Sequence, residues 1–415
     1  MRALARMLEP FLEKGQLIII DAENVRHELG ARAPGPKAVI RFHDRWLPLK
    51  MLWDPELVGA EAYMDGRLTL EEGTHVNDLI SVFTVNRGPF NATALQKVVW
   101  SFKDGHARRK QRLDLSRNKA QVRHHYDLNT DLYRLFLDDG LNYSCAYYRT
   151  PEDTLEQAQA AKLDHLIAKL DLKPGMRVLE IGGGWGSLAI RMAQAGADVT
   201  SLNVSPEQIR IAEKRVEALR LQNNVEFICK DYNEFSGEYD RVISVGMMEH
   251  VGIGNFDAYF AKVKECLSPK GFGVIHSIGR YTPPGTTGPF LTKYIFPGGY
   301  VPSLSEVFAA TERQRLWVCD AEILRLHYYY TLRAWRLRFE ANWDKAKALY
   351  DERFCRMWQL YLSACEMGFL EGSTMVFQLI VSRERDAVPL LRDFIGDNER
   401  KLQAAAGHDT WFQRA

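Results

Sequence analysis

The most constraining feature of this sequence is a run of closely spaced glycines at residues 178–186, Val-Leu-Glu-Ile-Gly-Gly-Gly-Trp-Gly. An apolar stretch that favours a strand precedes the glycines, and the residues after them, 187–194, favour a helix. Gly182, Gly184 and Gly186 alternate, which differs from the GxGxxG spacing of dinucleotide-binding loops. Glycines let a backbone approach a ligand closely, and a helix N-terminus suits a carboxylate. S-adenosylmethionine has a nucleoside and a carboxylate; a purely structural loop is the alternative.

Alternating strands and helices follow the loop. Strands are predicted at residues 197–202, 225–229 and 240–245, with an amphipathic helix at 206–221. This alternation indicates an α/β fold with a mostly parallel sheet, in which ligands bind at the carboxyl ends of the strands. Asp231, just after the predicted strand at 225–229, is placed to accept a hydrogen bond from an adenine amino group.

The end of the second strand lacks an acidic residue. Its sequence, Leu202-Asn203-Val204-Ser205, has no Asp or Glu where nucleotide sites usually bind the ribose hydroxyls. Gln208, one turn further on, is the nearest polar substitute.

Seven further segments, together with the glycine loop, resemble the cyclopropane fatty acid synthases and the related mycolic acid methyltransferases. The resemblance runs from about Tyr126 to Arg383, and the segments occur in that family's order. They are residues 125–128 (His-Tyr-Asp-Leu), 143–147 (Tyr-Ser-Cys-Ala-Tyr), 202–208, 244–252, 275–279 (Ile-His-Ser-Ile-Gly), 293–299 (Lys-Tyr-Ile-Phe-Pro-Gly-Gly) and 353–369.

This resemblance implies a Rossmann-like class I methyltransferase that transfers a methyl carbon from S-adenosylmethionine to a cis double bond of a phospholipid acyl chain. It also implies that bound bicarbonate removes the proton before ring closure, and no metal is expected. The implied catalytic cage comprises Cys145, Glu249, His276, the backbone at Ile278, and Tyr328. The cofactor-binding residues are predicted to be Tyr143, Ser144, Glu180, Gly182, Gly184, Gly186, Asn203, Gln208, Asp231 and Tyr232.

Some of these assignments leave alternatives open. Tyr328 stands in a run of three tyrosines, and it is chosen by its register with Thr331, Leu332 and Trp335. Cys145 is a poor candidate for a nucleophile, because no His-Asp arrangement accompanies it and the chemistry needs no covalent step. Tyr147 and Tyr294 are candidates for stabilising a carbocation through their π faces.

The length of 415 residues suits more than one domain. We expect a small N-terminal α+β domain associated with lipid or membrane at residues 1–95, a basic linker at 96–125, and a catalytic domain at 126–415. In the N-terminal part, residues 16–21 and 38–42 are predicted strands, and Pro34-Gly35-Pro36 is predicted to form a turn. The run Gly59-Ala-Glu-Ala-Tyr-Met-Asp-Gly66 resembles the N-terminal domain of bacterial cyclopropane synthases.

The net charge of +1 argues against a general polyanion binder, but residues 97–123 contain nine Lys or Arg and only two Asp. Three interpretations are open: a solvated linker, a nucleic-acid contact, and a segment that contacts anionic lipid. No nucleic-acid fold surrounds the run, and we favour the lipid interpretation.

We find no stretch of ~18–20 apolar residues that predicts a membrane span, and no signal peptide at the N-terminus. The six cysteines show neither CxxC nor zinc-ligand spacing. We therefore expect a cytoplasmic protein, peripheral on the inner face of the cytoplasmic membrane. A homodimer is the candidate oligomeric state.

Three other functions remain open. The same methyl transfer gives a methyl- or methylene-branched chain if the cation is quenched otherwise. A methyltransferase acting on a head group or small molecule is more distant, because residues 290–301 are mostly apolar. The non-enzyme alternative is a lipid-binding protein that retains the fold.

Overall fold

The computed structural model describes residues 1–86, 129–252 and 254–406. These residues form two compact units. One unit contains residues 1–86, 287–297 and 332–374, and we call it the N-terminal unit. The other contains residues 129–286, 298–331 and 375–406, and we call it the sheet unit. Two segments that the sequence analysis assigns to the catalytic domain, 287–297 and 332–374, thus group with the N-terminal residues.

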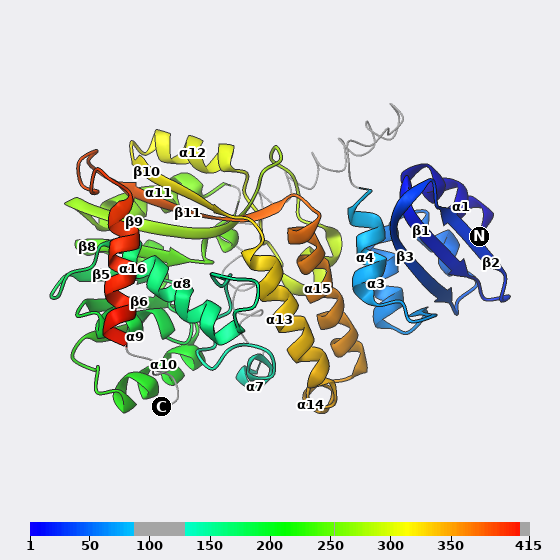
Figure 1. Cartoon of the computed structure of the whole chain (residues 1–415), viewed down its shortest axis with the longest axis horizontal. Coiled ribbons are helices and arrows are strands. Elements are labelled where there is room, and N and C mark those ends of the chain that lie inside the picture. Colours follow the sequence, from blue (N-terminus) through cyan, green and yellow to red (C-terminus); the bar gives the residue numbers. More distant parts are fainter. Residues whose placement is uncertain (87–128, 253, 407–415) are drawn as a thin grey trace. The chain divides into compact units, whose positions relative to one another are not determined.

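The N-terminal unit combines a small sheet with helices (Figure 1). Its strand order is β2-β1-β3-β4, with β1 parallel to β3 and the other pairs antiparallel. Helix α15 packs against α3 and α4. Its elements are α1 (Arg2–Leu8), η1 (Glu9–Phe11), β1 (Lys14–Ile20), β2 (Arg26–Gly30), β3 (Ala33–Phe42), α2 (Leu47–Met51), α3 (Pro55–Met64), β4 (Leu68–Leu70), α4 (Val76–Thr84), η4 (Leu291–Ile295), most of α13 (His327–Ala341), α14 (Trp343–Leu349) and α15 (Glu352–Leu370).

The predicted turn at Pro34-Gly35-Pro36 is wrong, because these residues lie inside β3. The pairing of β1 with β3 jumps here, from Lys14 opposite Ala33 to Gln16 opposite Lys37. Gly15 therefore lies opposite the whole triplet Pro34-Gly35-Pro36. Its φ of +76° allows β1 to accommodate the two extra residues of β3. Proline is tolerated in a strand at such an irregularity, because no ladder hydrogen bond needs its missing N–H.

The sheet unit is built on a seven-stranded sheet with the order β10-β11-β9-β8-β5-β6-β7 (Figure 1). Its elements are α7 (Thr130–Arg134), α8 (Leu155–Leu170), β5 (Arg177–Ile181), α9 (Ser187–Gln194), β6 (Asp198–Asn203), α10 (Pro206–Ala218), β7 (Val225–Cys229), η2 (Tyr232–Glu234), β8 (Tyr239–Val245), η3 (Met248–His250), α11 (Phe256–Cys266), β9 (Leu267–Arg280), α12 (Leu304–Arg313), β10 (Trp317–Leu324), β11 (Thr374–Ser382) and α16 (Asp393–Ala406).

The strand order reverses at β5. Strands β6 and β7 lie on one side of it, β8 and β9 on the other, and all these pairs are parallel. In such sheets the crevice at the carboxyl ends of the two strands flanking the reversal is the usual ligand site. The predicted α/β fold with a mostly parallel sheet is confirmed, and the reversal places its site after β5 and β8.

Successive residues of the central strands face opposite layers of the core. Val178, Ile243 and Val274 pack with α8, α9 and α16, whereas Leu179, Val242 and Ile275 pack with α11 and α12. A strand covered on both faces reads as a continuous apolar run, as these do. Within the described ranges, no helix has the length and apolar character that crossing a bilayer requires.

Candidate functional site

The glycine loop that follows β5 has three glycines with positive φ, at +91°, +52° and +83° for Gly182, Gly184 and Gly186. They differ in what surrounds them. A Cβ on Gly186 would lie 2.8 Å from the Cβ of Ala212 and 2.9 Å from the ring of Phe227. A Cβ on Gly184 would meet no atom within 4 Å. The missing side chain at Gly186 therefore lets Ala212 and Phe227 pack against the loop. Gly184 instead borders open space that a ligand can enter.

Asn203 and Gln208 support this loop from the end of β6. The side-chain amide of Asn203 donates to the carbonyl of Gly184 at 3.0 Å and to Oε1 of Gln208 at 2.9 Å. Nε2 of Gln208 is buried and has no hydrogen-bond partner among the residues the structure describes. Asn203 thus holds the loop in shape, and Gln208 presents a donor suited to a ligand hydroxyl.

Glu180 lies in β5, just before the glycine loop, and accepts a hydrogen bond from Ser201 at 2.6 Å. Its burial raises the pKa of the carboxyl to about 7. A Cβ on Gly183 would lie only 1.9 Å from Oγ of Ser201. Ser201 therefore occupies the volume that any side chain at Gly183 would need, which explains the glycine at that position.

Asp231 and Tyr232 follow β7. Oδ1 of Asp231 accepts from the backbone N–H of Asn233 at 2.9 Å and so caps η2. The ring of Tyr232 is buried in edge contact with Tyr259, with 5.7 Å between the centroids. One carboxylate oxygen of Asp231 thus has a structural role, and the cofactor roles of both residues remain predictions.

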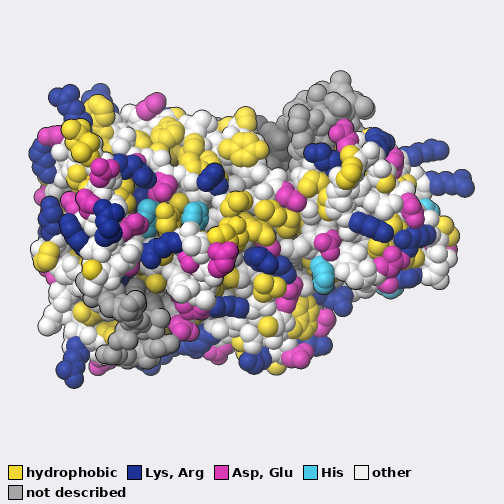
Figure 2. All heavy atoms as spheres, in the orientation of Figure 1, with side chains coloured by type: hydrophobic (Ala, Val, Ile, Leu, Met, Phe, Trp, Pro, Cys, Tyr) yellow, Lys and Arg dark blue, Asp and Glu magenta, His cyan; other side chains and the backbone are white. Residues whose placement is uncertain are grey.

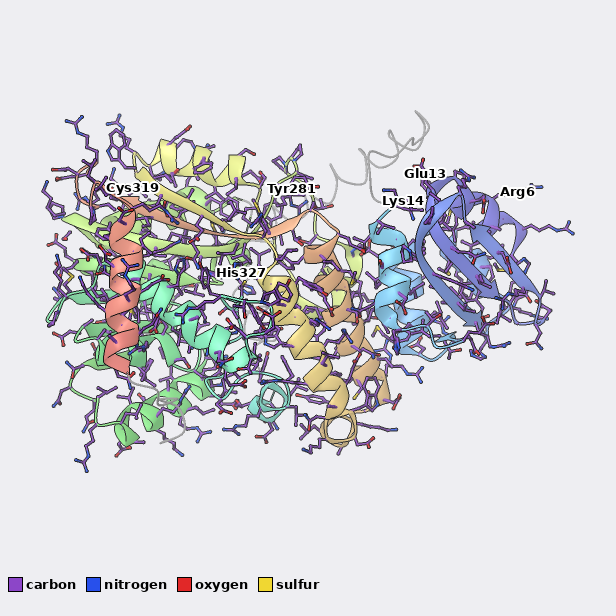
Figure 3. The ribbon with its side chains drawn as sticks, in the orientation of Figure 1. Arg6, Glu13, Lys14, Tyr281, Cys319 and His327 are labelled. Carbon is purple, nitrogen blue, oxygen red and sulfur yellow. The ribbon has the colours of Figure 1, made fainter. Side chains whose placement is uncertain are left out.

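The segment around Cys145 is fixed by the start of α13. The hydroxyl of Thr331 accepts from the N–H of Ala146 at 3.0 Å, and Nδ1 of His327 (labelled in Figure 3) accepts from that of Tyr148 at 2.9 Å. Cys145 is 1% exposed, and burial raises the pKa of its thiol. A thiol that stays protonated is a weak nucleophile, so this site does not favour covalent catalysis by Cys145.

Glu249 and Ile278 meet where β8 and β9 end. Oε1 of Glu249 accepts from the backbone N–H of Ile278 at 2.6 Å. The other oxygen, Oε2, is buried without a hydrogen-bond partner within the described ranges. Burial raises the pKa of Glu249 to about 7. The N–H of Ile278, which is predicted to belong to the catalytic cage, therefore donates to Glu249 itself. Oε2 of Glu249 remains available to accept a hydrogen bond from a ligand.

His276 lies one residue before Ser277 on β9, opposite Val245 of β8. The amide of Gln378 donates to its Nδ1 at 3.1 Å, and burial lowers the pKa of the imidazole to about 3. The ring is therefore neutral at physiological pH. With Nδ1 accepting, the proton resides on Nε2, which can donate to an anion.

Of the three adjacent tyrosines, Tyr328 is buried, whereas Tyr329 and Tyr330 are half-buried. The ring of Tyr330 packs against Tyr148, with 5.4 Å between the centroids. Tyr328 lies one turn before Thr331, which bonds the Tyr143–Tyr148 segment. The choice of Tyr328 for the cage stays a prediction that its burial favours.

Tyr147 and Tyr294 have partners other than a substrate. The ring of Tyr147 stacks between His165 and His327, at centroid distances of 4.3 and 4.8 Å. In the N-terminal unit, Lys293 lies over the ring of Tyr294 at 5.1 Å. These contacts limit the π faces that a substrate could reach, and the cation-stabilising roles of Tyr147 and Tyr294 stay predictions.

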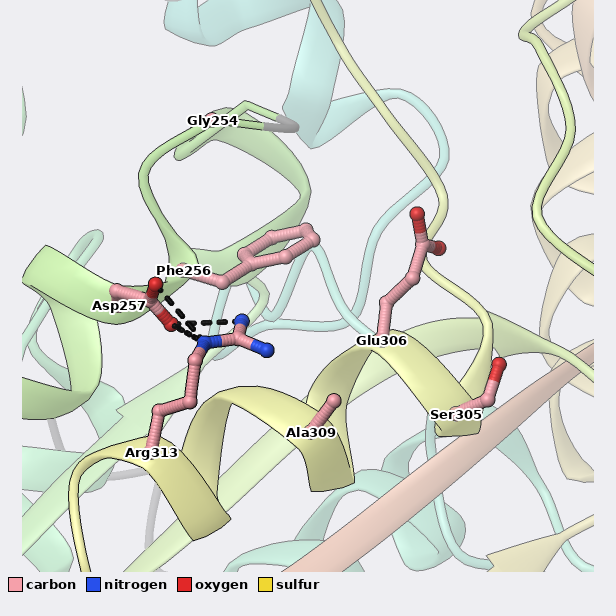
Figure 4. Close-up of a pocket in the computed structure, with 7 residues that line it drawn as sticks. All are labelled: Gly254, Phe256, Asp257, Ser305, Glu306, Ala309 and Arg313. Carbon is pink, nitrogen blue, oxygen red and sulfur yellow. Dashed lines mark hydrogen bonds and ion pairs between the residues drawn. The ribbon is translucent and has the colours of Figure 1, made fainter.

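A surface pocket of about 250 Å³ lies between α11 and α12. Arg313 and Asp257 form an ion pair there at 2.8 Å (Figure 4). The pocket is lined by Gly254, Phe256, Asp257, Ser305, Glu306, Ala309 and Arg313. None of these belongs to the predicted catalytic or cofactor sets, so this pocket is separate from the site at the glycine loop.

Several side chains that complete the site were not predicted. Ser201 holds Glu180, Gln378 sets the tautomer of His276, and Lys162 donates to Ser144. Gln378 is the single polar residue in the interior of the apolar strand β11, a pattern that suggests a satisfied buried amide at most. Sequence offers no signal for its partner.

Comparisons with known proteins show the family to which this chain belongs. A family model described as mycolic acid cyclopropane synthetase matches residues 113–379. Cyclopropane-fatty-acyl-phospholipid synthase of Escherichia coli (strain K12) is 41% identical over 271 residues, which span 65% of this chain and 69% of that protein. Tuberculostearic acid methyltransferase UfaA1 of Mycobacterium tuberculosis is 38% identical over 344 residues, 79% of each chain.

Among solved structures, mycolic acid cyclopropane synthase CmaA1, complexed with SAH and CTAB, matches with a TM-score of 0.60 at 31% identity. The match covers 63% of this chain and 97% of CmaA1. SAH is the product that S-adenosylmethionine leaves after methyl transfer, so the matched fold is one that binds this cofactor.

Proposed function

This chain belongs to the mycolic acid cyclopropane synthetase family of S-adenosylmethionine-dependent methyltransferases, and from that premise we propose that it converts cis double bonds of phospholipid acyl chains into cyclopropane rings. We further propose that bicarbonate serves as the base. The observation that carries the proposal is the buried Glu249 carboxylate, anchored by Ile278 and with one oxygen left for a proton donor, at the strand ends where His276 also lies.

The cofactor site fits S-adenosylmethionine. The open space at Gly184 admits a nucleoside, and the unpartnered amide of Gln208 can donate to a ribose hydroxyl. The cage fits bicarbonate, since Oε2 of Glu249 can accept the acidic proton of that ion and Nε2 of His276 can donate to its oxygens. When bound, these two groups supply an electrophilic methyl and a base.

The residues of the cage then have distinct tasks. Glu249 holds bicarbonate in place by accepting a hydrogen bond from its O–H group, and the Ile278 N–H keeps the carboxylate oriented. Neutral His276 donates to the anion without adding a positive charge that would raise the energy of a nearby carbocation. Oε2 of Glu249 is buried, and a cage closed around the acyl chain would keep water from the cation, which would otherwise be quenched to an alcohol.

Incubation of the purified protein with vesicles of a cis-monounsaturated phospholipid and S-adenosylmethionine tests this function. We expect a new acyl chain heavier by one CH₂ unit, with cyclopropyl proton resonances. Its formation should slow when bicarbonate is removed and recover when it is restored. A product that forms at the same rate in bicarbonate-free buffer would contradict the assignment of the base.

The second candidate is methyl transfer without ring closure, giving a methyl- or methylene-branched chain. The observation in its favour is that the similarity to UfaA1, which is named a methyltransferase, extends over more of this chain than the similarity to the E. coli synthase. The same product analysis separates the two, because branched chains lack cyclopropyl resonances.

We expect turnover to rise with pH through about 7. The pKa of Glu249 is raised by burial, so below about 7 its carboxyl is protonated and cannot accept from the base. At saturating bicarbonate, kcat/KM should therefore show an ascending limb near that value. Because the pKa of Glu180 is also raised to about 7, Glu180→Gln is the control, and the limb should persist in that variant. Its disappearance would assign the titration to Glu180 instead.

We also propose that the protein contacts the membrane that holds its substrate. The basic run at residues 97–123 lies outside the described residues. In the N-terminal unit, Trp46 and Trp53 are 54% and 86% exposed, and Leu49 and Leu52 between them are exposed as well. Arg45 lies over the Trp46 ring at 5.1 Å. Exposed tryptophan beside a cation is typical of membrane interfaces. Elsewhere, basic and acidic side chains are interspersed on the face shown in Figure 2.

Replacing Trp46 and Trp53 together with alanine should weaken binding to phosphatidylglycerol-containing vesicles by about tenfold or more, from the apolar area that insertion buries. This loss should persist at high salt.

A second variant replaces Arg108, Arg109, Lys110 and Arg112 with glutamine, and its loss of vesicle binding should fade as salt screens the charges. The half-exposed Trp317 gives the control Trp317→Ala. Equal sedimentation of all variants with vesicles would remove both segments from the membrane contact.

A further inference from the structure

Lys162, in α8, is the feature of the site that the proposed chemistry does not use. It is only 2% exposed. Its ammonium donates to Oδ1 of Asn142 and to Oγ of Ser144, both at 3.1 Å. Both partners are neutral. Another buried lysine of the same helix, Lys169, instead forms an ion pair with Glu322. Lys162 thus places a cation beside the predicted cofactor residue Ser144 without a carboxylate as its direct partner.

The hydrogen bonds around Lys162 have a fixed direction. The amide of Asn142 donates to Oδ2 of Asp138 at 2.7 Å, which turns its oxygen toward Lys162. An ammonium has donors only, so Oγ of Ser144 must accept from it. The Ser144 hydroxyl proton must then point to a different acceptor. Lys162 therefore leaves the half-buried Ser144 to donate its hydroxyl proton to another acceptor, which a ligand can supply.

The charges around Lys162 favour an anionic acceptor. Burial raises the pKa values of the carboxyl groups of Asp138 and Glu180, which disfavours their charged forms. The thiol of Cys145 and the imidazole of His276 are both neutral. The direct hydrogen-bond partners of the ammonium, Asn142 and Ser144, carry no charge, so a ligand with a carboxylate-type group near Ser144 would place a negative charge close to the cation.

We propose that Lys162 is a positioning residue that fixes the Ser144 hydroxyl as a hydrogen-bond donor to a carboxylate-type oxyanion of the bound ligand. This inference rests on the proposed function, which provides two such groups: the amino-acid carboxylate of S-adenosylmethionine, and bicarbonate. Their chemistry is shared, a planar oxyanion with two acceptor oxygens, and binding measurements separate the two sources.

The test compares two nucleosides by isothermal titration calorimetry. S-adenosylhomocysteine carries the amino-acid carboxylate, and methylthioadenosine lacks it. In Lys162→Met, the affinity for S-adenosylhomocysteine should fall by about tenfold to a hundredfold, the effect of a hydrogen bond to a charged group. The affinity for methylthioadenosine should change by less than about twofold, which also shows that the nucleoside pocket is intact.

Two further variants separate positioning from a structural role. Ser144→Ala should show the same selectivity, and adding Lys162→Met to it should cost little more, because the lysine acts through the serine. Lys169→Met, the matched buried lysine, should lower the melting temperature without distinguishing the two nucleosides. If Lys162→Met does not fold, Ser144→Ala carries the comparison. Equal losses for both nucleosides would assign Lys162 a purely structural role.

The second arm measures bicarbonate. If S-adenosylhomocysteine binding is unchanged but the bicarbonate concentration for half-maximal turnover rises about tenfold, the oxyanion is bicarbonate. If neither quantity changes, the proposal is overturned. The nucleoside arm needs no turnover, so it remains informative even if no ring product is found, and a failure of the proposed function is seen separately in the product analysis.

The pH dependence provides an additional readout. Burial lowers the pKa of Lys162 to about 8, so its positive charge is present below about 8 and lost above it. The preference for S-adenosylhomocysteine over methylthioadenosine should decline as pH rises through that value and be flat in Lys162→Met. A decline that persists in the variant would assign the titration to another group. The titratable groups that act on Lys162 or lie near it are Asp138, Cys145, Glu180 and His276.

Discussion

Replacing Glu249 with glutamine is expected to reduce turnover by about a hundredfold or more while leaving S-adenosylhomocysteine binding unchanged. The amide keeps the size of the side chain, but it cannot offer the charged acceptor that holds the proton of the base. Groups positioned for proton transfer typically contribute factors of this size. The measurement is the steady-state rate of product formation on phospholipid vesicles, with cofactor affinity determined in parallel.

The matched control for this substitution is Asp257→Asn. Asp257 pairs with Arg313 in the surface pocket between α11 and α12 (Figure 4), and it belongs to neither the predicted catalytic set nor the predicted cofactor set. Its change from carboxylate to amide should leave turnover within about twofold. If Glu249→Gln also stays within about twofold of the parent, corresponding to ~0.4 kcal/mol in the barrier, Glu249 is not part of the catalytic cage.

Replacing Gly184 with valine is expected to abolish measurable binding of S-adenosylmethionine. A Cβ at this position would meet no protein atom, so the new side chain would fill the space that we assign to the cofactor. The fold should remain, with a loss of ~1–2 kcal/mol because a branched residue is strained at a φ of +52°. Calorimetric titration with S-adenosylhomocysteine and a thermal melt measure the two effects separately.

Two other glycines act as references for this variant. Gly175 also has a positive φ, +79°, with no atom within 4 Å of its Cβ position. Gly175→Val should therefore reproduce the strain without the loss of binding. Gly186→Val should destabilise the fold, because its Cβ would clash with Ala212 and Phe227. Unchanged cofactor affinity in Gly184→Val would place the cofactor elsewhere.

The sequence predicted the sheet unit best where a signal was local. Helix α9 and strand β7 have the predicted bounds, since glycines or polar turns mark their ends. Helix α10 ends at Ala218 rather than at residue 221, because Arg220 adopts a φ of +58°. The triplet Pro34-Gly35-Pro36 has the composition of a turn, yet the parallel pairing of β1 with β3 keeps it inside a strand. Tertiary pairing overrode local preference there.

Lys162 illustrates why part of the site was not predicted. Gln159, Lys162, His165 and Lys169 recur at helical spacing along α8, a pattern that ordinarily indicates a solvent-facing side. In the structure all four are buried, since the Tyr143–Tyr148 segment, β10 and α16 supply their polar partners. Those partners come from distant parts of the chain. Only the fold reveals that the polar face of α8 points inward.

The most direct test of the central claim uses S-adenosylmethionine with a fully deuterated methyl group and vesicles of a cis-monounsaturated phospholipid. Ring closure removes one proton from the transferred methyl carbon. We therefore predict acyl chains that carry a cyclopropane ring and retain two of the three deuterons, as seen by mass spectrometry and NMR. Chains that retain all three deuterons on an intact methyl branch would contradict ring closure, and chains without any label would contradict methyl transfer itself.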